Sequence, residues 1–313
     1  MRDEGVIRSG TNQEGIALLT VLLATALIAL LAVGLTTEQR IGLRRTENLF
    51  EGDQAMLLAR GMEEWGVQLL IKDLQASSSD HLGEDWAVGL LPVPVGEGMV
   101  VGRIEDLQGR ININNLVKND QTIDSVTSDR FERLYDLCGM DSAKVDALAD
   151  WLDSNSTRLP DGAEDDDYLL NEIPYRSGNR TMVSTSELLL VDGITSEGFR
   201  CMEESVTVLP VWTKINVNTA GVMVIASIAG ITPAAAAEVV RDRPKNGYST
   251  PTDFLSHPRI VGSSVSPGDL ELKSDFFQLT GQAVYGGSEV LLYSALARDS
   301  GRVRVFSHSI GAY

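Results

Sequence analysis

The hydrophobic pattern begins with an unbroken apolar run near the amino terminus. No charged residue occurs from Gly15 to Thr37, and Leu, Ala, Ile and Val dominate this stretch. As a helix rising about 1.5 Å per residue, the run is about 35 Å long, enough to cross the hydrocarbon core of a bilayer. It is too long for the apolar region of an ordinary secretory signal peptide. The sequence therefore predicts a membrane-spanning helix over residues 16–37.

The helical pattern continues beyond the apolar run. After Thr37 the apolar positions thin to one stripe with spacings of four, three and four residues, formed by Leu58, Met62, Trp65 and Leu69. This is the period of an amphipathic helix. Since no proline occurs before Pro92, one long helix over residues 16–74 is predicted. The alternative is a plain membrane anchor followed by a separate helix.

Strand patterns appear in two groups far apart in the chain. Residues 99–104 and 110–114 are typical of two early strands, and three late strands are expected at 276–285, 289–297 and 302–309, joined by glycine-containing turns. The Ser-, Gly- and Pro-rich residues 76–98 are expected to form a loop. The stretch between the two groups, from about Val117 to about Ser274, is predicted to be mostly helical. The expected fold class is α+β, with a long helix and early and late strands in one unit that a large helical insertion splits.

The inserted stretch contains a degenerate internal repeat. Each copy has an Asn-rich segment, at 111–115 and 215–219, followed by a helix that a glycine closes in the left-handed conformation, Gly139 or Gly230. In the second copy Thr232 and Pro233 then provide a helix cap and a first helical residue. This copy resembles a helix-hairpin-helix module, a fold often used to grip DNA phosphates.

The charge of the chain argues against nucleic acid as a partner. The sequence has 44 acidic and 26 basic residues, a net charge of −18, and phosphate binding depends on Lys and Arg. The hairpin carries a thin basic flank of Arg241, Arg243 and Lys245, and Thr232 stands where DNA-binding members usually have a second glycine. A protein-packing module is preferred. A membrane-tethered nucleic-acid binder remains the alternative function.

The acidic residues concentrate in one loop. Nine acids and two bases lie between Asp141 and Asp167. Counted from Asp153, positions one, three, five, seven, nine and twelve match the oxygen ligands of a calcium loop, and they are filled by Asp153, Asn155, Thr157, Leu159, Asp161 and Glu164. Arg158 replaces the glycine at position six, so the turn need not follow an EF-hand. A structural calcium site is predicted, and the alternative is a solvated acidic loop.

Other chemistry is sparse in the sequence. The three histidines are isolated, and no phosphate-binding loop, dinucleotide motif or GxSxG motif occurs. A membrane-tethered, metal-dependent hydrolase using the acidic loop is a third hypothesis. The two cysteines, Cys138 and Cys201, form no zinc motif. They could form a disulfide in an oxidising compartment or remain buried thiols, and the sequence leaves both open.

The amino-terminal pattern resembles a type IV prepilin signal. A short polar leader ends in Gly15, and Ile16 starts the apolar helix. In that family a membrane peptidase cuts after the glycine and methylates the new amino terminus. Most members carry Glu at the fifth mature position, where this chain has Thr20. That Glu can pair with the amino terminus of a neighbouring subunit, and its lack marks minor pseudopilin K, which caps the pseudopilus of type II secretion.

The resemblance to the minor pseudopilin K family extends from Gly15 to the final strands. It includes the Asp-Trp-x-Asp and Gly-Ala-Glu-Asp runs within 150–167, which add Asp165 to the implied calcium ligands, and the segments 174–180 and 184–190. It implies a type IV pilin-like fold, with the long helix on an antiparallel sheet and a helical inserted domain. The implied boundaries are a leader at 1–15, a transmembrane segment at 16–37, pilin-like parts at 38–117 and 275–313, and the inserted domain at 118–274.

The resemblance also implies a function and a location. The chain would be a non-enzymatic tip subunit that starts or caps the fibre. Its partners would be the prepilin peptidase, the minor pseudopilins I and J, and a secreted substrate or the outer-membrane secretin, without nucleic acid. It would cross the inner membrane once, with its carboxy-terminal domain in the periplasm. This orientation rests on the resemblance, because the leader mixes acids with bases and the positive-inside rule does not decide it.

Overall fold

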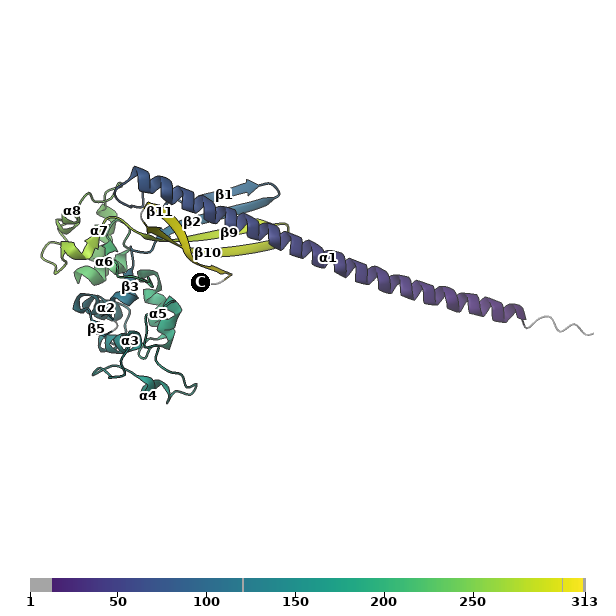
Figure 1. Cartoon of the computed structure of the whole chain (residues 1–313), viewed down its shortest axis with the longest axis horizontal. Helices are drawn as coiled ribbons and strands as arrows, with labels where there is room; N and C mark the ends of the chain where they lie inside the picture. The colour runs from purple at the N-terminus through teal and green to yellow at the C-terminus, as the bar shows by residue number, and fades with distance from the viewer. Residues whose placement is uncertain (1–12, 120, 300, 312–313) are drawn as a thin grey trace, which may run out of the picture.

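One helix, α1 (Gln13–Ala76), dominates the shape of the molecule. The computed structural model describes residues 13–119, 121–299 and 301–311. At about 1.5 Å per residue, the 64 residues of α1 extend for about 96 Å, and its first half projects alone from the rest of the chain (Figure 1). Its large apolar side chains between Ile16 and Leu35 are 56 to 71% exposed. The prediction of one long helix is confirmed, and α1 fits a single-pass membrane anchor. The expected leader lies mostly outside the described residues.

The second half of α1 lies on a five-stranded antiparallel sheet. The strand order is β1-β2-β9-β10-β11, with bounds β1 (Leu90–Val95), β2 (Gly98–Asp106), β9 (Phe276–Tyr285), β10 (Ser288–Asp299) and β11 (Arg302–Ile310). The chain leaves the sheet after β2 and returns in β9, and these two strands are direct neighbours, with Ile104 opposite Leu279. The three late strands and the antiparallel sheet are confirmed.

Small residues allow α1 to approach the sheet closely. The helix face against the sheet carries Ala55, Ala59, Met62, Gly66 and Leu70, at spacings of three and four residues. A Cβ atom on Gly66 would lie 2.1 Å from the Leu279 side chain, so any larger residue here would force Leu279 to move. The predicted stripe was therefore only partly right. Met62 is buried and Leu58 and Leu69 pack against the same core, whereas Trp65 is 37% exposed.

Two expectations about early strands were wrong. The stretch 76–98 is not all loop, because β1 forms there and tolerates Pro92 and Pro94 as an edge strand. Residues 110–114 do not form a full strand. Only β3 (Ile111–Asn112) is extended, and a 3₁₀ turn (Ile113–Asn115) follows. The reason lies in the asparagine side chains: Asn112 and Asn115 donate to the carbonyls of Val211 and Thr213, at 2.9 and 2.6 Å, and so connect distant backbone segments without a strand ladder.

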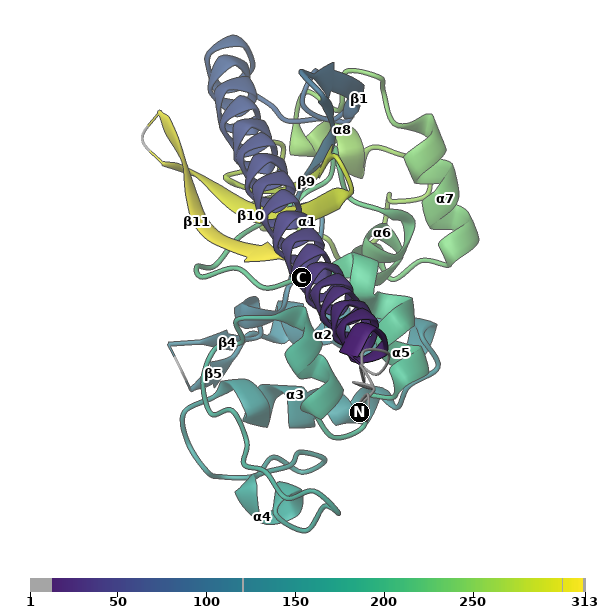
Figure 2. The ribbon, with the colours of Figure 1, turned by 90° about the vertical axis from the view of Figure 1, so that its right-hand side faces the viewer.

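The inserted unit lies to one side of the α1 axis (Figures 1 and 2). It has one apolar core, formed by residues such as Phe131, Leu134, Leu148, Trp151 and Ile225. Its helices are short: α2 (Ser125–Leu137), α3 (Val145–Leu152), α4 (Asp165–Tyr168), α5 (Ser196–Met202), α6 (Val222–Ala229), α7 (Pro233–Asp242) and α8 (Pro251–Leu255). Besides β3 it contains the two-residue strands β4 (Val117–Lys118), β5 (Thr122–Ile123), β6 (Val206–Thr207), β7 (Ile215–Asn216) and β8 (Leu270–Glu271).

A buried polar cluster joins the inserted unit to the sheet. Arg298, on β10, donates to Asp80 at 2.5 Å and to Asp73 at 2.6 Å. Asp106, at the end of β2, accepts hydrogen bonds from Asn216 and Ser274 at 2.9 and 2.7 Å. The chain leaves the sheet just after Asp106 and returns to it just after Ser274. Both connections therefore lie in one hydrogen-bonded network, which fixes the orientation of the inserted unit. Burial raises the pKa of Asp106 to about 6.

The raised pKa of Asp106 predicts a dependence of stability on pH. The folded protein keeps this proton at pH values where the unfolded chain, with an ordinary carboxyl pKa of 3.8, has lost it. The contribution of Asp106 to the free energy of unfolding therefore falls as pH rises from about 4 to about 6, by on the order of 2 kcal/mol. The free energy of unfolding should therefore differ less between pH 4 and pH 7 in Asp106→Asn than in the wild type, by about this amount. Chemical denaturation in detergent at the two pH values would measure it.

The comparison needs a matched control. Asp106→Asn also turns one hydrogen-bond acceptor into a donor and lowers stability at both pH values, so the readout is the difference between them. Asp136→Asn, at an exposed position on α2, should leave that difference unchanged. An Asp106→Asn protein with the wild-type pH difference would contradict the prediction.

Candidate metal centre

The acidic loop lies between α3 and α4, at the end of the inserted unit farthest from α1 (Figure 2). Three of its carboxylates are almost fully buried: Asp150, Asp153 and Glu164 are 0, 4 and 6% exposed. The Glu164 carboxylate has no side-chain hydrogen-bond partner among the described residues, and the groups that face it are backbone amides at the start of α4. Buried carboxylates without a positively charged partner are costly and uncommon. An arrangement of this kind suits a hard cation that accepts oxygen ligands.

The electrostatics of the three carboxylates support this interpretation. Burial, followed by the negative charges of Asp150 and Asp153, raises the pKa of Glu164 to about 7. Burial likewise raises the pKa of Asp150 to about 6 and that of Asp153 above its ordinary value. In the described part of the chain, no Lys or Arg forms a salt bridge with any of the three. The site therefore has a concentration of negative charge that a bound cation would neutralise.

The predicted ligands have different surroundings in the structure. Asp153 and Glu164 lie in the buried group. Asn155 accepts a hydrogen bond from the Thr157 backbone at 2.7 Å, and Thr157 and Asp161 are exposed. Asp165 is bound elsewhere, to Arg176 at 3.1 Å and to the Ser177 backbone at 2.9 Å. Its carboxylate is thus already neutralised in this structure.

Sequence reasoning missed Asp150, which is the most buried carboxylate of the loop. Its side chain accepts a hydrogen bond from the Leu159 backbone at 3.1 Å. A Cβ atom on Gly162 would lie 1.8 Å from the Asp150 carboxylate, so the loop closes over this group only with glycine there. The signal was the three-residue spacing between Asp150 and Asp153 at the end of α3, which puts both on one helix face. Counting the calcium pattern from Asp153 excluded it.

Another acidic cluster occurs at the junction of the two units. Asp73, Asp80 and Glu84 offer oxygens within 4.8 Å of one another, the one group of this kind among the described residues. Arg298 already supplies positive charge to two of them, at 2.5 to 2.6 Å. This cluster is therefore an ion-pair network that holds the units together.

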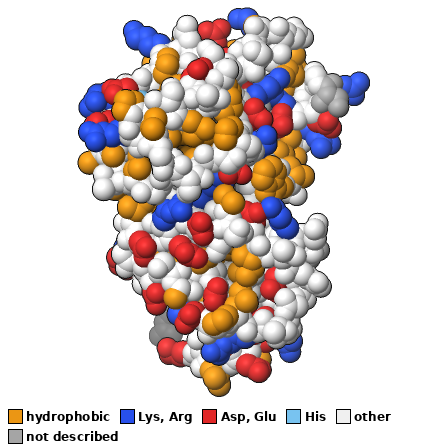
Figure 3. All heavy atoms as spheres, turned by 90° about the vertical axis from the view of Figure 1, so that its left-hand side faces the viewer, with side chains coloured by type: hydrophobic (Ala, Val, Ile, Leu, Met, Phe, Trp, Pro, Cys, Tyr) orange, Lys and Arg blue, Asp and Glu red, His pale blue; other side chains and the backbone are white. Residues whose placement is uncertain are grey.

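The hairpin between α6 and α7 has the expected local geometry. The helices meet at 116°, Gly230 has a φ of 64°, and the Thr232 hydroxyl accepts from the Ala235 backbone. Two of the three basic residues of its flank are engaged within the protein, however. Arg243 donates to the Ala220 carbonyl, and Arg241 pairs with neighbouring Asp242 at 3.0 Å. On the face shown in Figure 3, acidic side chains are prominent in the lower half, away from α7. These features do not favour a nucleic-acid surface.

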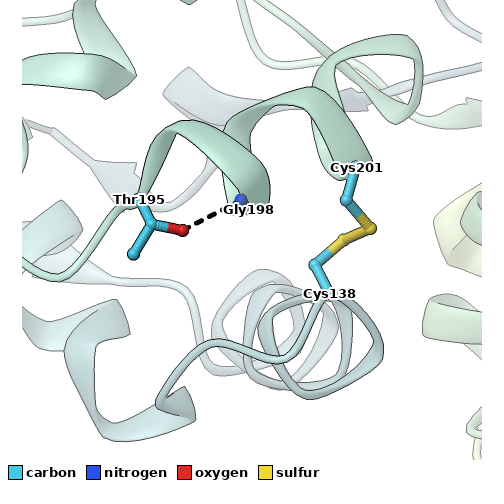
Figure 4. The surroundings of a disulfide bond; sticks show 4 residues. All are labelled: Cys138, Thr195, Gly198 and Cys201. Carbon is cyan, nitrogen blue, oxygen red and sulfur yellow. Dashed lines mark hydrogen bonds between the residues drawn. A yellow bond between two sulfur atoms is a disulfide. The ribbon is translucent and has the colours of Figure 1, made fainter.

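The structure joins the two cysteines in a disulfide (Figure 4). Cys138 follows the last residue of α2, and Cys201 lies in α5. The Thr195 hydroxyl caps α5 by accepting from the Gly198 backbone at 3.0 Å. Gly198 also lets Met140 pack against α5, because a Cβ atom there would lie 2.2 Å from the Met140 sulfur. The disulfide therefore fastens the turn after α2 to α5.

A long apolar helix that fits a membrane anchor lies on an antiparallel sheet, with a helical insertion between β2 and β9, and this defines a protein of mixed α and β architecture. Comparison with known proteins identifies its family. Residues 109–211 and residues 215–272 match two family models, both described as "Type II secretion system (T2SS), protein K". The chain belongs to the type II secretion system protein K family.

Full-length relatives agree with this assignment. The chain is 34% identical to the type II secretion system protein K of Pseudomonas aeruginosa over 314 residues, covering 96% of this chain and 93% of the relative. It is 29% identical to that of Pectobacterium carotovorum, covering 97 and 98%. Its fold resembles one chain of the GspK-GspI-GspJ complex from enterotoxigenic Escherichia coli, with a TM-score of 0.77 at 21% identity over 86% of this chain and 100% of that chain. These findings support a role in type II secretion.

The buried Glu164 carboxylate predicts an unusual response to mutation. Without divalent cations, we expect Glu164→Gln to raise the free energy of unfolding by about 1 to 3 kcal/mol, because it removes a buried negative charge that has no positively charged partner and lies near two other carboxylates. Urea denaturation in a chelator would measure the change. The matched control is Glu172→Gln, an exposed position in the same region, which should change nothing. A destabilised Glu164→Gln protein under these conditions would contradict the electrostatic account.

Proposed function

We propose that this protein is a minor pseudopilin at the tip of the type II secretion pseudopilus, where it starts or caps the fibre and does no catalysis. The observation that carries the proposal is the combination of a bare apolar helix with a broad head. The helix would pack among partner helices. The sheet, which is the pilin-like part, and the inserted unit, which is the helical domain, would lie in the periplasm. There the head would meet secreted proteins or the outer-membrane secretin.

The periplasmic part of α1 supports packing against partner helices. Leu43, Phe50 and Leu57 follow one another at seven-residue spacing and are 67, 56 and 60% exposed. This heptad spacing is typical of helices that pack together along their length. The solved complex that this fold resembles contains proteins I and J besides K. We infer that the corresponding minor pseudopilins I and J cover this stripe.

Two features support a position at the end of the fibre. The inserted unit extends sideways beyond the axis of α1 (Figure 1), so it would obstruct a further subunit above it. Thr20 offers no carboxylate for the amino terminus of a neighbour, since its hydroxyl donates to the Ala17 carbonyl of the same helix at 2.8 Å. A subunit with nothing above it needs no such carboxylate.

The stripe on α1 can be tested by substitution. Burying one leucine stabilises an interface by about 1.5 to 3 kcal/mol, so Leu57→Glu should lower co-purification of the minor pseudopilins I and J from membranes by about tenfold or more. Leu57→Met, which keeps an apolar side chain of similar size, should retain them. Equal recovery with Leu57→Glu would show that this stripe is not an assembly surface.

Processing of the amino terminus gives a further test. If the chain enters the fibre as a pseudopilin, prepilin peptidase would cut between Gly15 and Ile16 and methylate the new amino terminus. Intact-mass spectrometry of the protein from native membranes should therefore show a chain that begins with N-methylated Ile16. A chain that retains residues 1–15 would exclude this class.

We also propose that the buried carboxylates bind a structural calcium ion. The residues that fit are Asp150, Asp153 and Glu164, because their oxygens are hard ligands, all three are buried, and none has a positively charged partner among the described residues. The Leu159 carbonyl and the side chains of Asn155, Thr157, Asp161 and Asp165 complete the sequence pattern and remain candidates. The ion would neutralise the loop and order it, without a catalytic role.

Calcium should stabilise the wild-type protein and not the variant. We expect saturating calcium to raise the thermal midpoint by several degrees, because it binds the folded state alone, and we expect Glu164→Gln to abolish most of this rise. Differential scanning calorimetry with calcium or chelator would measure both. Glu172→Gln should respond as the wild type does, and a wild-type protein indifferent to the chelator would rule the site out.

A further inference from the structure

The Cys138–Cys201 disulfide closes the segment that contains the whole acidic loop. Its two cysteines are 63 positions apart, and every candidate cation ligand lies between them. We propose that this disulfide is a positioning crosslink for the cation site, so that oxidation of the cysteines and calcium binding each strengthen the other. The inference rests on the proposed calcium site and adds to it a dependence on the redox state of the chain.

The closed segment has little regular structure of its own. From Asp153 to Ser184 it contains one helix, α4, with four residues. Helices of this length are unstable in isolation, so packing and crosslinks must order the chain around them. The three buried carboxylates oppose that order while no cation is bound, because their charges repel one another. Any constraint on the ends of the segment therefore bears directly on how readily the site forms.

A continuous set of contacts leads from the disulfide to the carboxylates. Cys201 lies in α5, and the chain just before α5 contains Asp192, whose backbone donates to the Tyr168 hydroxyl at 3.2 Å. Tyr168 ends α4, the helix that starts directly after Glu164. Its ring also packs edge-on against Trp151, at 5.3 Å between centroids, and Trp151 follows Asp150 in α3. Fixing α5 therefore positions both chain segments that carry the ligands.

An ion pair also connects the segment after α2 to the segment before α5. After the disulfide and the turn at Met140, Lys144 pairs with Asp192 at 2.8 Å. This ion pair is partly exposed, so it contributes little by itself. The covalent bond between α2 and α5 is the strong constraint, since it limits the unfolded segment as well as the folded one. Cys201 is exposed, so a reductant can reach the disulfide.

Thermodynamic linkage makes the proposal quantitative. If the disulfide strengthens calcium binding by some factor, calcium must shift the equilibrium of disulfide reduction by the same factor. We expect a factor of about ten, within the usual range of coupling between sites. Since stable disulfides form in oxidising compartments, the site would become complete only after the inserted unit has left the reducing cytoplasm.

The experiment measures both sides of this linkage on the full chain in detergent. Isothermal titration with calcium compares the oxidised wild type with the Cys138→Ser, Cys201→Ser double variant, in which the dissociation constant should rise about tenfold. Leu279→Ala is the control, because it weakens the core between α1 and the sheet and leaves the disulfide intact. Its calcium affinity should equal that of the wild type.

The reciprocal arm uses only the wild-type protein and so does not depend on the folding of the variant. In glutathione redox buffers, thiol alkylation and mass spectrometry give the fraction reduced, and calcium should shift that equilibrium about tenfold toward the disulfide relative to chelator. An unchanged redox equilibrium, or equal calcium affinity in the double variant, would overturn the crosslink inference and leave the calcium site standing. Oxidised wild type that binds no calcium would overturn both.

Discussion

The close contact between α1 and the antiparallel sheet is the constraint on which the rest of the molecule depends. Small side chains on the helix, above all Gly66 against Leu279, allow the two to meet at short range. This contact orients the sheet along the second half of the helix and leaves the apolar first half bare. The network around Arg298 then attaches the inserted unit to that sheet at a fixed angle.

The fold was predictable from the sequence where one pattern repeats over many residues. The apolar run and the helical stripe predicted α1, and the alternating late segments predicted β9, β10 and β11. The prediction was wrong where side chains decide the backbone: Asn112 and Asn115 bond to residues about 100 positions away and end the strand that the local pattern favoured. Such long-range hydrogen bonds leave no periodic signal. For the same reason the Arg298 network was not foreseen.

The candidate site was predictable as a region and only in part as a set of residues. The density of acids and the spacing from Asp153 to Glu164 indicated the loop beside which the structure places three buried carboxylates. Which carboxylates are buried depends on how the loop closes, and this closure requires Gly162 beside Asp150. A pattern taken from another loop geometry could not show that Asp165 pairs with Arg176. The disulfide was likewise left open, because the proximity of Cys138 and Cys201 depends on the packing of α2 against α5.

The pairing of β2 with β9 has a consequence for biosynthesis. Almost 170 residues separate these neighbouring strands in the chain, so the sheet cannot close until the final segment has emerged from the ribosome. Until then the glycine- and alanine-lined side of α1 has only β1 and β2 to pack against, whereas the insertion already holds its complete core. We expect the inserted unit to fold first and to bring the two halves of the sheet together, because contacts this distant in sequence form slowly unless an intervening structure shortens the loop.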